Sequence, residues 1–157
     1  MDNEKMNKLI KEIDSLYTFV MDSYDVYAQA RDYGNGEKMN MAEIHTLTLI
    51  ADNPGITVSG VSKMWNRTMS AASQNINKLC KKDLLEKRKE KGNDKTIHLY
   101  VTDEGQQLSD MHKAYDEKEL EITAKKLLEH HSLEELNSAL NVIKTGIKIL
   151  ESNQKKD

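Results

Sequence analysis

The sequence has little cysteine, proline or glycine. It holds one Cys, one Pro and seven Gly among 157 residues. The lone Cys80 excludes an internal disulfide, as is typical of proteins kept in the reducing cytoplasm. Scarce Pro and Gly, together with many Leu, Ile, Lys and Glu, favour helices. The sequence therefore predicts a cytoplasmic, mainly α-helical protein.

Long apolar runs are also missing. No stretch approaches the ~18 apolar residues of a membrane span, and the chain begins Met-Asp-Asn-Glu, so we expect neither a membrane span nor a signal peptide. Hydrophobic residues make up only 38% of the chain, which favours a thin core completed by a subunit interface. No nucleophile–base pair, phosphate-binding loop or paired-carboxylate pattern occurs. We therefore expect neither an enzyme nor a cofactor.

Positive charge, by contrast, is concentrated in one stretch. Residues Thr57–Thr102 hold ten Lys or Arg against four Asp or Glu, although the whole chain has a net charge of −3. A basic segment inside an acidic protein is the footprint of a surface that meets phosphate. The stretch is therefore the predicted contact with nucleic acid.

Helices are predicted on both sides of the basic stretch. Apolar residues recur at steps of three and four over residues 3–31, 41–52 and 103–130. A last helix begins at Ser132, which forms a capping box with Glu135.

The outer helices carry apolar stripes too long for a small monomer. We therefore predict a helical dimerisation region over residues 1–35 and 103–157, and a DNA-binding lobe over residues 40–102. The tail from Gln154 is expected to be disordered.

The sequence of the lobe predicts two short helices followed by a β-hairpin. Thr57 is a plausible N-cap for a helix over Val58–Trp65, and Thr68 for a second helix reaching Lys82. Strands are predicted over residues 84–90 and 96–102, joined by a charged turn. Two helices joined by a tight turn let the second lie in the major groove. The predicted fold is mainly α with a small antiparallel hairpin, a winged helix-turn-helix.

The outer side of the second helix supplies the predicted base-reading residues. Amide and small side chains there suit base edges, because Gln pairs with adenine and Ala touches the thymine methyl. These predicted readers are Ser70, Ala71, Ser73, Gln74, Asn77 and Lys78. The basic residues around them are predicted to contact phosphates. They are Lys63, Arg67, Lys81, Lys82, Lys87, Arg88, Lys89, Lys91 and Lys95.

The motifs of this stretch resemble the MarR family of bacterial transcription regulators. The resemblance rests on Val61-Ser62-Lys63, on Leu84-Leu85-Glu86-Lys87-Arg88 and on Thr102-x-x-Gly105 after the hairpin. It implies a homodimer that binds pseudo-palindromic double-stranded DNA, commonly as a repressor. It also implies release of the DNA when a small ligand enters between the dimerisation region and the lobe.

Scattered matches are similar to FabT-type repressors of fatty-acid synthesis genes. They include Glu43-Ile44-His45-Thr46 and His112-Lys113, and they imply an acyl chain as effector. Met and Tyr side chains suit an apolar ligand. The predicted pocket comprises Tyr17, Met21, Tyr24, His45, Leu108, Met111, His112 and Tyr115.

The chain departs from the family pattern at two positions. Lys95 stands at the wing tip where the family has Arg, and Lys suits a narrow minor groove less well. Asp83 stands where the family prefers Gly after the reading helix.

Alternative functions remain open. Cys80 could sense oxidants. Histidines could bind a regulatory metal, although no H-x-x-x-H or C-x-x-C spacing occurs and we assign no residue as a metal ligand. Hydrogen-bonded structural histidines are the simpler interpretation. A protein–protein adaptor whose winged helix does not bind DNA is the alternative from another class.

Overall fold

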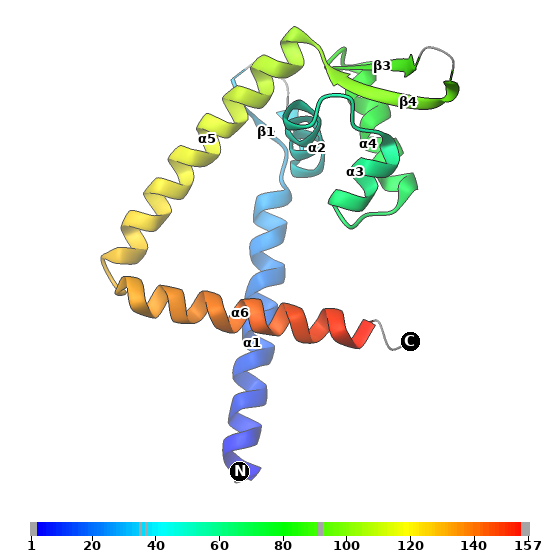
Figure 1. Ribbon diagram of the computed structural model, residues 1–157. Helices are drawn as coiled ribbons and strands as arrows, with labels where there is room; N and C mark the ends of the chain where they lie inside the picture. Colours follow the sequence, from blue (N-terminus) through cyan, green and yellow to red (C-terminus); the bar gives the residue numbers. More distant parts are fainter. Residues whose placement is uncertain (1–2, 35, 37, 91–92, 155–157) are drawn as a thin grey trace. The chain divides into compact units, whose positions relative to one another are not determined.

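The computed structural model describes residues 3–34, 36, 38–90 and 93–154. It divides into two compact units, Met1–Tyr115 and Asp116–Asp157. The elements of the first unit, drawn in Figure 1, are α1 (Asn3–Ala28), β1 (Arg31–Asp32), β2 (Lys38–Met39), α2 (Met41–Asp52), α3 (Val58–Met64), α4 (Met69–Lys81), β3 (Leu85–Glu90), β4 (Asn93–Val101) and the start of α5 (Asp103–Leu128). The second unit holds the rest of α5 and α6 (Leu133–Gln154).

The predicted helix caps are confirmed. The Thr57 hydroxyl accepts a hydrogen bond from Gly60 N at 3.2 Å and begins α3. The Thr68 hydroxyl accepts from Ala71 N at 3.2 Å and begins α4. Each satisfies a backbone N–H that a helix start leaves unpaired. These two caps fix where the paired helices of the lobe begin.

The capping box before α6 is also present. Ser132 donates from its backbone N–H and its hydroxyl to the Glu135 carboxylate, and the hydroxyl accepts from Glu135 N. These donors hold the pKa of Glu135 below its usual range.

The core of the first unit lies among α2, α3, α4, the base of the hairpin and the first turns of α5. The predicted inner face of α4, formed by Ala72, Ile76 and Leu79, is buried. The remaining core residues are Met39, Ile44, Leu47, Ile50, Val61, Leu84, Leu85, Leu99 and Leu108. Apolar burial therefore holds α4 by one face and leaves the opposite face outward.

The hairpin of β3 and β4 forms the predicted antiparallel wing, with Leu85 opposite Val101 and Lys87 opposite Leu99 (Figure 1). Its strands differ from the predicted bounds. Strand β4 begins at Asn93 rather than residue 96, so the turn is shorter than expected. Leu84 lies just before β3 as a core residue.

The wing joins α5 through one residue, Thr102. Its hydroxyl donates to the Asp83 carbonyl at 2.8 Å and accepts from Gly105 N at 3.0 Å. Its backbone N–H donates to the Leu84 carbonyl at 3.1 Å. A methyl group on Gly105 would lie 2.1 Å from that same carbonyl oxygen. The Thr-x-x-Gly motif is thus a close backbone contact between the start of α5 and the start of the wing.

Four predicted helix ends lie too far along the chain, and for α3 and α4 the difference is one residue, with ends at Met64 and Lys81. Helix α1 ends at Ala28 rather than residue 31, because Arg31 and Asp32 pair with β2 in a small hairpin that the sequence did not reveal. The Asp32 carboxylate accepts from Gly34 N and Gly36 N, which shapes its turn. Helix α5 ends at Leu128 rather than residue 130.

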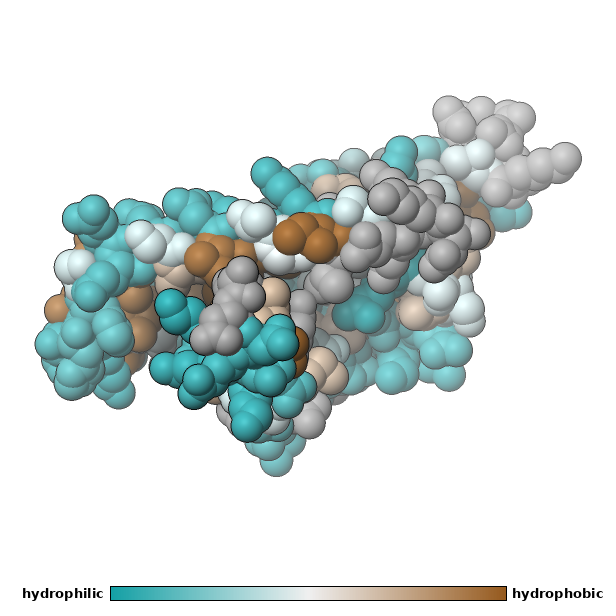
Figure 2. Space-filling model, turned by 90° about the horizontal axis from the view of Figure 1, so that it is seen from below, coloured by the Kyte–Doolittle hydropathy of each residue, from teal (hydrophilic) through white to brown (hydrophobic). Residues whose placement is uncertain are grey.

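Exposed apolar side chains are abundant on the outer helices. On α1, Leu9, Ile10 and Ile13 are each at least 43% exposed. On α6, Leu140, Ile143 and Ile147 are each at least 41% exposed. Brown hydrophobic patches reach the surface on the face drawn in Figure 2. Among the described residues, no helix combines the length and hydropathy needed to cross a membrane.

Candidate nucleic-acid interface

The outward face of α4 carries the predicted readers. Ser70 and Gln74 are exposed, while Ala71 and Ser73 are half-buried. Within the part of the chain that the structure describes, the Gln74 amide makes no hydrogen bond. Its donor and acceptor are therefore available to a base edge.

The other two predicted readers are engaged within the protein. The Asn77 side-chain oxygen accepts a hydrogen bond of 2.6 Å from Lys87 Nζ on β3. This bond ties α4 to the wing. A base that takes the Asn77 oxygen must replace the Lys87 contact.

Lys78 lies beside a buried acid, Glu43 of α2. Glu43 is 7% exposed, and its carboxylate lies 3.3 Å from Lys78 Nζ and 3.9 Å from Lys82 Nζ. A carboxylate buried this deeply requires charged partners. Glu43 therefore fixes the C-terminal turns of α4 against α2, a role that the sequence analysis missed because the partners lie on separate helices.

The predicted phosphate contacts form an exposed rim. Lys63, Arg67, Lys81, Lys87, Arg88 and Lys89 are all exposed, and Lys82 is half-buried. The Arg88 guanidinium donates to Glu86 and lies 4.4 Å from the centre of the Tyr100 ring. These contacts hold the Arg88 side chain in one position. Lys91 lies outside the described residues, as do the side chains of Lys95 and Tyr17 and residues 155–157 of the predicted tail. The first residue of that tail, Gln154, was predicted to be disordered but is the last residue of α6.

The residues predicted to line one ligand pocket do not lie together in the structure. Leu108 is a core residue, and Met21 and Met111 are exposed. His45, His112 and Tyr115 gather with Tyr33, which sits edge-on to both His112 and Tyr115. Tyr24 lines a different cavity.

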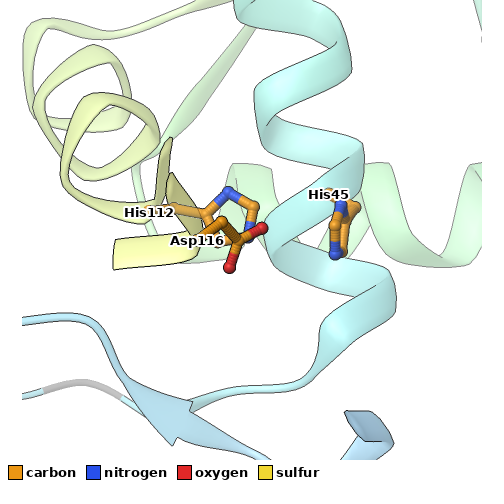
Figure 3. Close-up of side chains that lie close together, drawn as sticks. All are labelled: His45, His112 and Asp116. Carbon is orange, nitrogen blue, oxygen red and sulfur yellow. The ribbon is translucent and has the colours of Figure 1, made fainter. Parts of the chain in front are cut away.

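Two histidines pack edge to face in the aromatic group. The His45 and His112 ring centres lie 4.8 Å apart, and His112 is 2% exposed. The Thr48 hydroxyl lies 3.1 Å from His112 Nδ1. Asp116 follows His112 by one turn of α5, and Figure 3 shows the three side chains close together. Imidazole and carboxylate groups are ligands that zinc accepts. Sequence spacing could not reveal this set, because His45 lies on α2.

The cavity next to Tyr24 opens between α1, α2, α3 and α4. It encloses about 250 Å³. Its apolar wall includes Met41, Ala42, Val61, Trp65 and Ala72, and its polar groups include Thr46, Arg67 and Asn75. Helix α4 therefore forms one wall of this open cavity.

Cys80 is half-buried on α4. Burial raises the pKa of its thiol, while the charge of Lys87 acts in the opposite direction. Because the thiolate is the reactive form, a raised pKa makes the thiol less reactive at neutral pH. Burial of Cys80 therefore disfavours the reactive thiolate form.

Part of the chain is similar in sequence to known transcription regulators. Residues 38–95 match the model of the MarR family. An uncharacterized HTH-type transcriptional regulator of Bacillus subtilis, YhjH, is 29% identical over 87 residues, which span 55% of this chain and half the length of that protein.

Solved structures share the fold. FabT of Streptococcus pneumoniae in complex with DNA has a TM-score of 0.61 at 20% identity, over 96% of this chain and 99% of FabT. ZitR of Lactococcus lactis, a zinc-responsive MarR family member, has a TM-score of 0.67 at 17% identity, over 92% of this chain and 98% of ZitR. The expected winged helix-turn-helix fold is confirmed.

Proposed function

We propose that the chain is a member of the MarR family, whose model residues 38–95 match, and that it is a cytoplasmic transcriptional repressor. It binds a pseudo-palindromic DNA operator as a homodimer, with two half-sites one helical turn (~34–36 Å) apart. The relative YhjH is named an HTH-type transcriptional regulator, which supports a regulator rather than an enzyme.

One observation carries the proposal. Helix α4 is capped by Thr68, is buried on its inner face and presents Ser70 and Gln74 outward beside a basic rim. Such a helix has its readers pointing to base edges and its cations placed for phosphates. FabT, solved with DNA, shares this fold.

Homodimerisation is the second part of the proposal. Exposed Leu, Ile and Val side chains along α1 and α6 need a partner surface, because large apolar patches on a lone chain are unfavourable in water. A second copy of the same helices is the natural partner. Control by a small apolar ligand completes the proposal, while an acyl chain as that ligand stays a prediction from the sequence resemblance.

A mobility-shift titration against the protein's own promoter region tests DNA binding. The repressor requires a preference over scrambled DNA of equal length, typically 10³-fold or more at physiological salt. Equal affinity for both DNAs would reject a sequence-specific repressor, and no binding to either DNA would favour the adaptor alternative.

Two variants separate reading from anchoring. Gln74→Ala is expected to reduce discrimination at one base pair by about 1–3 kcal/mol. Lys63→Ala is expected to weaken binding to every sequence and to reduce the salt slope by about one. If Lys63→Ala changes sequence preference more than Gln74→Ala does, α4 is not the reader.

The histidine cluster supports a second candidate, a metal-responsive regulator. His45, His112 and Asp116 offer three ligand groups, and the Thr48 hydroxyl beside His112 Nδ1 is the kind of outer contact that orients a ligating imidazole. ZitR, described as zinc-responsive, shares the fold.

Titration with Zn²⁺ tests this candidate. Zinc is expected to change operator affinity in the wild type and to leave His45→Gln unaffected, with His131→Gln as the matched control because His131 is exposed and lies outside the cluster. An unchanged response in His45→Gln rejects the cluster as the metal site.

A further inference from the structure

We propose that Lys87 of the wing reads DNA sequence together with Asn77 of α4, and that this pair of side chains selects guanine in the major groove. This role rests on the proposed DNA-binding function. It moves Lys87 out of the predicted phosphate contacts, which fix the register of a protein on DNA but carry no sequence information.

Lys87 lies on the face of the hairpin that meets the core. It pairs with Leu99 across the hairpin, and Leu85, two residues earlier on β3, pairs with Val101. Cross-strand partners and residues two apart share one face of a sheet, and both Leu85 and Leu99 are buried. Strand β3 packs against α4 (Figure 1). The exposed end of the Lys87 side chain is therefore directed along α4.

Asn77 belongs to the outward row of α4. Ser70, Gln74 and Asn77 follow one another at steps of four and three residues, so they share one side of the helix. All three are exposed. The Lys87 ammonium reaches this row, because its Nζ lies 2.6 Å from the Asn77 side-chain oxygen. A cation from the wing thus stands beside the groups that face base edges.

The chemistry of lysine fixes the orientation of the Asn77 amide. A Lys ammonium donates hydrogen bonds and accepts none, so the amide atom that faces Lys87 is the oxygen. The amide NH₂ of Asn77 and the remaining N–H groups of Lys87 are then left for DNA. The positive charge beside the Asn77 oxygen also opposes the approach of another donor. The pair therefore offers donors to a base.

Guanine has the major-groove edge that matches a pair of donors. It presents two acceptors, N7 and O6, whereas adenine presents N7 beside an amino donor. Thymine presents one acceptor and cytosine a donor. An Asn side chain on its own pairs with adenine, because its oxygen accepts from the amino group. Adenine would have to take the Asn77 oxygen from Lys87, while guanine leaves the bond between the two side chains intact.

Selection from a library of random-sequence DNA duplexes tests this role with the full-length protein. The wild type is expected to select guanine at one position of each half-site, and Asn77→Ala to lose that preference. Lys87→Met removes the ammonium and keeps an unbranched side chain, so the released amide is expected to select adenine at the same position. A bond that only held the wing to α4 would change affinity without exchanging one base for another.

Lys63 provides the matched control. It is an exposed predicted phosphate contact on α3, and Lys63→Met makes the same chemical change away from α4. This variant is expected to bind every sequence more weakly and to keep the guanine.

Modified bases give a test that needs no protein variant. In the selected duplex, 7-deazaguanine in place of that guanine lacks the N7 acceptor, and wild-type affinity is expected to fall roughly fivefold or more. Hypoxanthine keeps N7 and O6 and lacks only the amino group of the minor groove, so it should leave the affinity unchanged.

Three results would overturn the role of the pair. They are retention of guanine by Lys87→Met, wild-type selection of another base at the position that Asn77→Ala affects, and equal affinity for guanine and 7-deazaguanine. A selected sequence that neither substitution alters would also reject the pair, and would leave the repressor function standing. Recovery of no preferred sequence by the wild type would reject the repressor function itself, and the role of the pair with it.

Discussion

Asp83 adopts a backbone conformation that suits glycine. It follows α4 with a φ of +55°, in the left-handed region that costs most L-residues about 1–2 kcal/mol. The position bends the chain from the reading helix into the wing, and the Asp83 carbonyl accepts the Thr102 hydroxyl. Asp83, which stands where the MarR pattern prefers Gly, is therefore locally strained in its backbone.

Replacement of Asp83 by glycine should relieve this strain. We expect Asp83→Gly to raise the free energy of unfolding by about 0.5–1 kcal/mol, since Gly adopts positive φ freely but is also more flexible when unfolded. Asp83→Ala should lower it, because Ala tolerates positive φ less well than Asp. Urea unfolding measures both. A glycine variant no more stable than the wild type would show that Asp83 is unstrained.

The Glu43 carboxylate gives a second prediction at the level of one residue. We expect Glu43→Gln to lower the free energy of unfolding by about 1–2 kcal/mol, because Lys78 and Lys82 lose the buried negative charge with which they pair. The partner lysines are partly exposed, and solvent screening keeps the effect below that of a fully buried pair.

Glu86 provides the matched control. Its side chain is 50% exposed beside Arg88, and Glu86→Gln should change unfolding by less than about 0.5 kcal/mol in the same urea titration. Similar effects of the two substitutions would mean that burial adds nothing at Glu43.

At the scale of elements, the start of α5 packs closely against the residue that precedes the wing. We expect Gly105→Ala to lower the free energy of unfolding by about 2–3 kcal/mol, since the added methyl meets the Leu84 carbonyl and the backbone must shift. Gly146→Ala in α6 is the control, because a methyl there meets no atom within 4 Å. It should instead stabilise by up to about 1 kcal/mol through helix propensity. Thermal unfolding of both variants measures this difference. A Gly105→Ala variant as stable as Gly146→Ala would contradict the close contact at Gly105.

Sequence patterns within one segment predicted most helices and strands. Contacts between residues far apart in the sequence were not predicted. Thr57, Thr68 and Ser132 were legible as caps because each bonds to a residue three positions ahead. The β1–β2 hairpin was missed because each strand has only two residues and leaves no period-two pattern. The Glu43 network and the cavity beside Arg67 were missed because they join residues of separate helices, which no sequence spacing encodes.

At the scale of the whole molecule, the exposed apolar helices predict self-association. We expect the protein to sediment as a dimer and Ile147→Glu to shift it toward monomer, because a carboxylate in an apolar interface costs several kcal/mol of desolvation. The reduced dimer population should also weaken binding to a two-half-site operator.

The neighbouring Lys148 supplies the comparison. It is exposed on α6, and Lys148→Glu makes a larger change of charge without placing that charge among the apolar side chains. A wild-type sedimentation profile for Ile147→Glu would place the subunit contact elsewhere.

The wing and α5 meet without a linker, since Thr102 alone separates β4 from α5 and binds backbone on both sides. The connection between β4 and α5 therefore contains no loop that could bend independently. A rotation of the first turn of α5 is therefore expected to carry the base of the wing with it, because the Thr102 hydroxyl is hydrogen-bonded to both Asp83 and Gly105. Movement of α5 would in this way change the angle of the wing without any linker between them.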